Sequence, residues 1–412
     1  MLSYRAARKI VTDVTLNLRH EIPSEELDLN TRLASAVGRT LLQEIFADRH
    51  YPPFDRAMRD GYAVRSADLG EVPRTLRVIG ECRAGTVFDA EVAKGQCVLI
   101  MTGAPVPRGA DAVVMLEYTE PGPPCSLDLI AFDRTAKPGQ NIVFAGSEAA
   151  QGKKVLHRGQ RLGYAELALA AQVGATRVRV ARRPSVALLS TGDEVVPIDV
   201  EPGEYQIRNS NCVSLAAQVV LSGARFVQLG NAADSREDLR EQMVQGLQED
   251  MLVISGGVSK GKYDLVESVL GALGAEFLFD SVDIRPGHPA VFATCGGKPV
   301  FGLPGNPVST MVTFELFATL SIDILSGAEP RALPLFRARL AAAAERAAAL
   351  THFIPARVSW ESGEPMVTEL THQGSADIVA LTESNCFLVM RPEHLQIAAG
   401  ELVDVLPRRG SL

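Results

Sequence analysis

The sequence lacks the features that mark several classes of protein. Its six cysteines are scattered, with no CxxC pair and no metal-site spacing, so we expect reduced thiols rather than a disulfide framework. A formal net charge of −8 argues against a general nucleic-acid-binding protein. The first residues lack the apolar core of a signal peptide, and no later run is long enough to cross a bilayer. We therefore expect a cytoplasmic protein that binds neither nucleic acid nor membrane.

The composition is that of an ordinary globular protein. With 412 residues, 46% of them apolar and 22% charged, the chain has room for several domains. Breaks in composition fall at Pro52, Pro138, Pro184 and near residue 330. Before the first break, residues 1–48 carry apolar residues at approximate helix spacing and are predicted to be helical.

The regions between the breaks differ in their patterns. Residues 75–130 consist of short, branched segments separated by glycine and proline, which predicts a β-rich insertion. From 184 to 325, strand patterns alternate with helix patterns, which predicts a doubly wound α/β domain. Within it we expect a strand over 276–284 and a long helix that starts at Asn306-Pro307 and ends at Leu325. Beyond residue 330 we expect a small β-barrel or sandwich, with a helix over 341–349 on propensity alone.

The segment Met251–Leu265 combines a buried strand with a glycine-rich turn. Its first four residues form a short apolar run, typical of a strand covered on both faces. Gly256 and Gly257 follow, and they allow a ligand to approach the backbone closely. A turn of this kind that opens a helix suits an anion, because free N–H groups and the helix dipole point toward it. The polar residues of the turn are Ser259, Lys260, Lys262 and Asp264.

This turn also matches most of a P-loop, and that interpretation is disfavoured. Gly256 is followed after four residues by Gly261 and Lys262, but the next residue is Tyr263. A P-loop requires a magnesium-binding serine or threonine there. In a doubly wound sheet, ligands gather outside the carboxyl ends of the strands. We therefore expect the turns after Leu189, Ile254 and Leu303 to lie along one edge.

Eight motifs, in order and at matching intervals, resemble the MoeA and gephyrin E-domain family. The resemblance covers nearly the whole chain. The motifs are FDRAMRDGYA (54–63), MTGAPVPRGADAVVMLE (101–117), PGQN (138–141), STGDE (190–194), SGGVSKGKYD (255–264), IRPGHP (284–289), GLPGNPVS (302–309) and GSADIVALTESNCFLV (374–389).

The resemblance implies a multidomain α/β fold with four domains. They are a helical or mixed N-terminal domain (1–48 with 137–180), a β-rich insertion domain (49–136), a molybdopterin-binding α/β domain (181–327) and a C-terminal β-barrel (328–412). It also implies a homodimer whose active site combines the α/β domain of one subunit with the insertion of the other. Transient contact with the molybdopterin adenylyltransferase is a further expectation.

The implied activity is that of a molybdopterin molybdenumtransferase. Such an enzyme inserts molybdate into adenylylated molybdopterin with magnesium and releases AMP. The resemblance implies catalytic roles for Asp60, Thr102, Glu194, Asp264 and Arg285, with Asp60, Glu194 and Asp264 as magnesium ligands. Substrate-binding positions would be Gly192, Asp234, Ser255, Gly256, Gly257, Ser259, Gly261, His288, Pro304, Gly305 and Asn306.

Other interpretations of these residues remain open. Asp60 also fits a solvated turn, Thr102 a turn cap, and Asp234 an acid that flanks a helix. The family's usual lysines are replaced by Arg285, which keeps a permanent charge, and by His288, which is a weaker anion ligand near neutral pH. These departures leave two alternatives: a non-catalytic molybdopterin-binding or scaffold protein, and a variant that handles tungstate.

Overall fold

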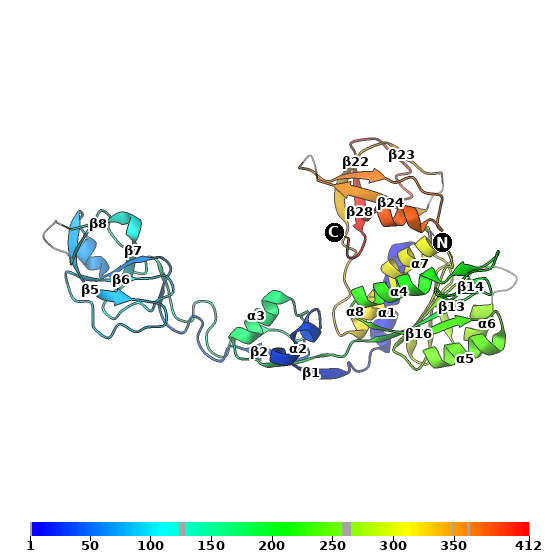
Figure 1. Cartoon of the computed structure of the whole chain (residues 1–412), viewed down its shortest axis with the longest axis horizontal. Helices are drawn as coiled ribbons and strands as arrows, with labels where there is room; N and C mark the ends of the chain where they lie inside the picture. The colour runs from blue at the N-terminus through cyan, green and yellow to red at the C-terminus, as the bar shows by residue number, and fades with distance from the viewer. Residues whose placement is uncertain (1, 123–127, 258–264, 348–349, 361–362, 412) are drawn as a thin grey trace. The chain divides into compact units, whose positions relative to one another are not determined.

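The chain forms two compact units in a computed structural model that describes residues 2–122, 128–257, 265–347, 350–360 and 363–411 (Figure 1). The first unit comprises Met1–Leu42, Gly159–Leu162 and Arg179–Leu412. The second comprises Gln43–Arg158 and Gly163–Val178. Each unit is described separately below.

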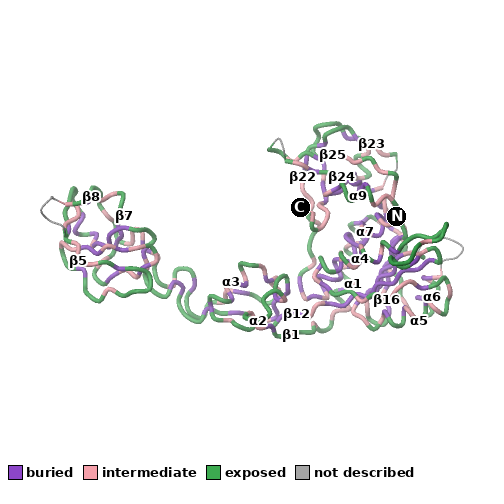
Figure 2. Tube along the Cα trace, viewed as in Figure 1, coloured by how far each residue is buried: buried purple, intermediate pink, exposed green. Residues whose placement is uncertain are grey.

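The first unit contains a six-stranded sheet whose first four strands run parallel. Strands β20 and β18 continue it in antiparallel fashion. Buried residues concentrate along this sheet (Figure 2). In spatial order the strands are β16 (Arg225–Ala232), β13 (Ser185–Thr191), β17 (Met251–Ser255), β21 (Lys298–Leu303), β20 (Val291–Cys295) and β18 (Glu276–Phe279).

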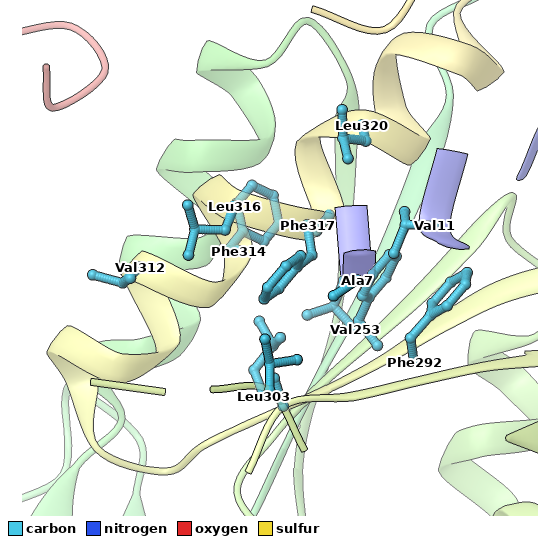
Figure 3. Close-up of a cluster of buried hydrophobic side chains, with 14 of the residues drawn as sticks. Ala7, Val11, Val253, Phe292, Leu303, Val312, Phe314, Leu316, Phe317 and Leu320 are labelled. Atoms are coloured by element: carbon cyan, nitrogen blue, oxygen red, sulfur yellow. The ribbon is translucent and has the colours of Figure 1, made fainter. Parts of the chain in front are cut away.

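Helices cover both faces of this sheet, because successive side chains of a strand point to opposite faces. In β13, Val186 and Leu188 pack with α4 (Ser210–Leu221) and α1 (Tyr4–Leu18). Ala187 and Leu189 instead pack with α5 (Arg236–Gly246) and α6 (Leu265–Ala272). Figure 3 shows the first of these cores, where Val11 of α1 and Val253 of β17 meet the aromatic side chains of a long helix. The predicted doubly wound α/β domain is confirmed.

The strand order creates a switch point between β13 and β17. The chain passes from β13 to its neighbour β16 on one side, and later to β17 on the other. Consequently α4 and α6, which follow β13 and β17, lie on opposite faces of the sheet. A crevice forms at such a point outside the carboxyl ends of the strands, where ligands bind in open α/β sheets.

The long predicted helix begins at Pro307 and ends at Leu325. It consists of α7 (Pro307–Thr313), a π-helical turn η3 (Phe314–Ala318) and α8 (Thr319–Leu325). By length and composition it is the one candidate membrane span among the described residues. The expectation that no run of the sequence is long enough to cross a bilayer was therefore too broad. However, 89% of its most apolar stretch is buried inside the protein, as in the core helix of a globular domain.

The C-terminal strands close into a five-stranded barrel. The pairing runs β24–β25–β22–β28–β26 and returns to β24, which confirms the predicted β-barrel. Strand β19 (Ile284–Arg285) of the α/β region adds to it by pairing with β24. The barrel strands are β22 (Phe336–Leu340), β24 (Thr351–Ser359), β25 (Met366–Glu369), β26 (Cys386–Met390) and β28 (Leu402–Pro407).

Three local predictions were wrong. Ser24–Asp28 is the strand β1 rather than helix, and α2 (Leu29–Ala36) begins only after it. The described part of 341–349 contains the short strand β23 (Ala344–Glu345), paired with β27 (Gln396–Ile397). The strand expected over 276–284 ends at Phe279. In the first two cases strand pairing with distant residues outweighs helix propensity, which is a weak preference.

The second unit is built mainly from an irregular six-stranded sheet, in agreement with the predicted β-rich insertion. It also contains the helix α3 (Tyr164–Gln172). In spatial order the strands are β7 (Ala112–Met115), β4 (Gly61–Val64), β6 (Gln96–Ile100), β5 (Arg74–Cys82), β9 (Leu129–Phe132) and β8 (Thr119–Pro121).

Candidate functional site

A cavity of about 700 Å³ opens at the carboxyl ends of β13, β17 and β21. We call it the rim cavity. The three turns that the sequence predicted to share an edge all line it. The predicted site residues that it contains are Gly192, Glu194, Asp234, Ser255, Gly256, Gly257, Pro304, Gly305 and Asn306.

Glycine is required where the turns approach one another. Gly256 has φ +93°, and a Cβ built there would lie 2.7 Å from the carbonyl oxygen of Thr191. Its amide donates to the Leu303 carbonyl at 3.0 Å. A Cβ on Gly305 would lie 3.7 Å from the Gly256 Cα, so these two turns are in contact as well. A side chain at position 256 would therefore both strain the backbone and clash with Thr191 in the turn after β13.

Glu194 folds back over Gly192. A Cβ on Gly192 would lie 2.6 Å from Glu194 Oε2, and the φ of this glycine is +132°. Only glycine leaves room for the carboxylate in this position. Glu194 is exposed and lines the cavity, so its oxygens are available to a ligand.

Asp234 is oriented by the neighbouring strand. The Thr191 hydroxyl donates to Asp234 Oδ1 at 2.9 Å, and the Asp234 amide donates to Asp193 at 3.1 Å. Capping of α5 is performed by Ser235, whose hydroxyl accepts from the Asp238 amide at 3.3 Å. The Asp234 carboxylate is thus placed at the cavity by β13 and is not needed as the helix cap.

Asn211 joins two of the three turns, those after β17 and β21, a role that the sequence interpretation missed. Its Nδ2 donates to Ser255 Oγ at 2.8 Å and to the Gly305 carbonyl at 2.7 Å. Its neighbour Asn209 caps α4, accepting from the Cys212 amide at 3.0 Å. The signal in the sequence was the pair of asparagines itself, since short amide side chains favour caps and tight turns.

A second cavity of about 1140 Å³ adjoins the rim cavity and is rich in basic side chains. We call it the basic cavity. Arg285 and His288 line it from the IRPGHP turn. The barrel contributes basic residues that no sequence motif indicated. These are Arg346, His352 and His372. The two cavities share Pro289, Pro304, Asn306 and Ala376, so they are contiguous.

The basic side chains of this cavity differ in how they are held. Arg346 forms an ion pair with Glu369. Arg285 is exposed, and within the described ranges it makes no ion pair. His288 Nδ1 lies 2.8 Å from the Val282 carbonyl, so Nδ1 carries the proton and donates it, while Nε2 remains for a ligand. Excess positive charge is therefore available to an oxyanion.

The barrel is attached to the turn that separates the two cavities. Asn306 Nδ2 donates to Ser375 Oγ at 3.0 Å, and the Val308 amide donates to the Ser375 carbonyl at 3.0 Å. Ser375 belongs to the GSADI segment, for which the resemblance gave no role. These bonds fix Asn306 at the boundary between the rim cavity and the basic cavity.

Asp60 and Thr102 form a pair in the second unit. The amide and the hydroxyl of Thr102 both donate to Asp60 Oδ1, at 2.6 and 2.8 Å. These two bonds, the amide first, hold the pKa of the exposed Asp60 carboxyl below its usual range. Asp60 is therefore ionised at neutral pH, and Thr102 fixes its orientation.

Part of the predicted site lies outside the described residues. This applies to Ser259, Gly261 and Asp264, and to the neighbouring Lys260 and Lys262. Among the residues that are described, no three histidine, cysteine, aspartate or glutamate side chains are grouped for a metal ion. The described geometry defines an α/β protein with adjoining cavities suited to a large anionic ligand.

Family models and similar proteins agree with this class. Models of the MoeA N-terminal region (domain I and II), a probable molybdopterin binding domain and the MoeA C-terminal region (domain IV) match residues 2–174, 187–323 and 337–407. A molybdopterin molybdenumtransferase of Bacillus subtilis is 33% identical over 91% of this chain and 88% of its own length. One from Staphylococcus epidermidis is 32% identical over 93% and 91%.

Solved structures show the same fold. A molybdopterin biosynthesis MoeA protein from Pyrococcus horikoshii matches with a TM-score of 0.78 at 27% identity, covering 99% of this chain and 100% of that one. The sequence relatives and the structural match extend over nearly the full length of the chain. The chain belongs to the MoeA family of molybdopterin molybdenumtransferases, which confirms the resemblance read from its motifs.

Proposed function

We propose that this chain is a molybdopterin molybdenumtransferase in molybdenum cofactor biosynthesis. It inserts molybdate into adenylylated molybdopterin in a magnesium-dependent reaction that releases AMP. The observation that carries the proposal is the contiguity of two cavities with different chemistry, one with carboxylates and backbone turns and the other with basic side chains. The names of the sequence relatives support the same reaction.

The rim cavity is assigned to the phosphates of the pterin substrate. Gly256, Gly257 and Gly305 line the cavity and have no side chains of their own. Phosphate oxygens can therefore approach their backbone N–H groups closely. Asn306 contributes at the boundary toward the basic cavity. Ser255 is fixed by Asn211 and supplies a further polar wall.

The carboxylates of the rim cavity suit magnesium. Magnesium is commonly bound by one or two carboxylates together with substrate phosphates, so a cluster of three protein ligands is not needed. Glu194 and Asp234 both line the cavity, and Asp264 is a further ligand by resemblance. A magnesium ion bound to the pyrophosphate would stabilise the negative charge on departing AMP. Glu194 and Asp234 would hold the ion and orient the pyrophosphate against the glycine turns.

The basic cavity is assigned to molybdate. Arg285 offers a planar set of N–H donors for an oxyanion, and Arg346 faces the same space. The Nε2 atom of His288 adds a contact that is positive only in the protonated ring. Because this cavity adjoins the rim cavity, the oxyanion would lie beside the pterin whose sulfur atoms receive the metal.

The direct test is incubation of the purified chain with adenylylated molybdopterin, magnesium and molybdate. AMP and active molybdenum cofactor should appear together, and both should depend on magnesium. If neither product forms, the enzymatic proposal fails. Binding of the pterin nucleotide without magnesium-dependent cleavage would instead indicate the non-catalytic or scaffold alternative, which the replacement of a family lysine by His288 keeps open. Competition between molybdate and tungstate would identify the preferred oxyanion.

Asp60→Asn is expected to abolish turnover. The exposed Asp60 carboxylate contributes little packing, so the thermal melt should stay almost unchanged. Asn at this position keeps the shape but loses the negative charge that Thr102 orients. Measured by AMP release, activity should fall at least 100-fold, equivalent to ~3 kcal/mol. A large loss of stability with retained specific activity would assign Asp60 a structural role.

A homodimeric site can be tested by mixing two inactive variants. If Asp60 of one subunit acts with Glu194 of the other, heterodimers of Asp60→Asn with Glu194→Gln contain one intact site. Random mixing should then restore about a quarter of the wild-type activity. Mixtures that stay inactive, although mass spectrometry shows subunit exchange, would place both residues in a site of one chain.

A further inference from the structure

A third cavity, of about 340 Å³, lies in the first unit and shares no residue with the rim cavity or the basic cavity. We call it the arginine cavity. It forms where α1, the helix η3–α8, the connection to the barrel and the C-terminal end of the barrel meet. Its lining includes four arginines and two carboxylates, namely Arg8, Arg331, Arg408, Arg409, Glu315 and Asp323.

Both carboxylates of this cavity are already engaged. Arg409 holds Glu315 through two bonds, Nε to Oε2 at 3.0 Å and Nη2 to Oε1 at 2.8 Å. Arg331 holds Asp323 in the same way, at 3.0 and 2.8 Å, and its own amide adds a third bond at 3.1 Å. Arg161 contacts Asp323 as well. These carboxylates, which are 8% and 2% exposed, are therefore neutralised by other arginines.

Two arginines of the cavity lack a carboxylate partner among the described residues. Arg8 donates to the backbone carbonyls of Leu316 and Arg331, the latter at 3.0 Å. These carbonyl oxygens accept from two of its five N–H groups and do not balance its charge. Arg408 Nε is enclosed and makes no hydrogen bond to any part of the chain that the structure describes. Within the described part of the chain, the positive charge of these two guanidinium groups is therefore not balanced by a carboxylate.

Burial makes this charge unfavourable. Burial lowers the pKa of the Arg8 guanidinium, and this effect outweighs the attraction of Glu315 and Asp323. It also lowers the pKa of Arg408. Arginine nevertheless stays protonated in proteins, so the desolvated charge is not relieved by loss of a proton. A bound anion would relieve it.

We propose that the arginine cavity binds a small phosphorylated organic molecule. The guanidinium groups of Arg8 and Arg408 would receive the phosphate, since a guanidinium fork matches phosphate oxygens in pairs. Leu333, Pro334 and Pro407 form an apolar wall for the organic part. The volume lies within the range of small-molecule sites and exceeds what a bare phosphate needs. The site is independent of the proposed transferase reaction.

The test uses phenyl phosphate, inorganic phosphate and phenylacetate as probes at low ionic strength. Calorimetry on the wild-type chain should give tighter binding of phenyl phosphate than of the other two. Arg408→Gln should weaken phenyl phosphate binding about tenfold, as expected for loss of one charge-assisted contact. The matched control is Arg240→Gln, because Arg240 is exposed on α5 and lines none of the three cavities.

Two further measurements keep the result interpretable. Hydrogen exchange should show protection of the amides of residues 331–333 and 408–411 when phenyl phosphate is added to the wild type, which distinguishes this site from the rim and basic cavities. If Arg408→Gln fails to fold, Arg408→Lys replaces it and should weaken binding while keeping the charge. Unchanged affinity in the folded variant, or protection only at the rim and basic cavities, would overturn the proposal. The arginines would then serve only to brace the C-terminal segment.

Discussion

The two ends of the parallel strands in the α/β sheet carry polar groups of different kinds. At the amino end, Asp250 precedes β17 and accepts from the Ser185 amide at 2.7 Å, the Ser185 hydroxyl at 2.9 Å, and Arg182 at 2.8 and 2.9 Å. At the carboxyl end, Glu194 is exposed at a cavity, beside glycines held at positive φ.

This difference separates stability from function within one sheet. The amino-end groups satisfy one another, so that they hold strands in register and leave nothing for a ligand. The carboxyl-end groups are held in place, yet their remaining oxygens face a cavity. Substitutions at the two ends should therefore affect different measurements, and the predictions below are ordered by expected size.

Glu194→Gln should have the largest effect, on activity alone. Loss of the carboxylate removes a proposed magnesium ligand, and AMP release should fall at least 100-fold, or ~3 kcal/mol in activation free energy. The melting temperature should remain within about 2 °C, since the side chain is exposed. Glu201→Gln, an exposed change that does not line the cavity, serves as the control and should be fully active. Comparable losses in both variants would remove Glu194 from the proposed site.

Asp250→Asn should act in the opposite way, on stability alone. Burial raises the pKa of this carboxyl, but the two bonds from Ser185 and the charge of Arg182 together bring it below the ordinary 3.8. Asn cannot accept all of these bonds, so the free energy of unfolding at pH 7 should fall by about 2 kcal/mol. Urea titration measures this, with exposed Glu241→Gln as the control.

The pH dependence of stability follows from the direction of the Asp250 shift. A carboxyl whose pKa is lower in the folded state stabilises the protein at pH values above its unfolded pKa. That contribution is lost as the pH falls below 3.8 and through the folded pKa. The difference in unfolding free energy between wild type and Asp250→Asn should therefore shrink in acid. A difference that is constant from pH 7 to pH 2 would contradict this assignment.

Arg285→Gln should have a smaller and more selective effect. It removes a permanent charge from the basic cavity, so molybdate should bind about tenfold more weakly, or ~1.4 kcal/mol. Affinity for the adenylylated pterin should change less than about twofold if the two cavities divide the ligands as proposed. Calorimetry with each ligand separates these outcomes, and Arg240→Gln again provides the control. Equal losses for both ligands would show that the cavities act as one site.

The local sequence predicted much of the rim cavity. The turns after β13, β17 and β21 were recognised because glycine, serine and acidic residues follow short apolar runs. Glycine is required at 192 and 256 because φ is positive there and because a Cβ would clash with neighbouring atoms. Such a requirement is indicated in the sequence by the glycine itself. The strands Ser24–Asp28 and Ala344–Glu345 were not recognised, because their pairing partners lie far away in sequence.

The basic cavity shows the limit of prediction from sequence. Arg285 and His288 belong to a motif, but Arg346, His352 and His372 come from barrel segments that no pattern connects to it. They meet because β19 pairs with β24 and because Ser375 bonds to Asn306. Neither contact has a signature in local residue spacing.

By itself the sequence indicated the family, because eight of its motifs resemble that family in order and spacing. It also determined the α/β and β-barrel classes of its parts and the glycine-rich turns, because these depend on periodicity and on residue types that only certain backbone angles accept. The tertiary structure decided the rest. It brought the carboxylates Glu194 and Asp234 to one cavity and collected basic side chains in the next. It also left Arg8 and Arg408 without carboxylate partners among the described residues. Which charges face one another depends on how the sheet and the barrel close. The residues concerned are far apart in the sequence, so local patterns do not reveal that they meet.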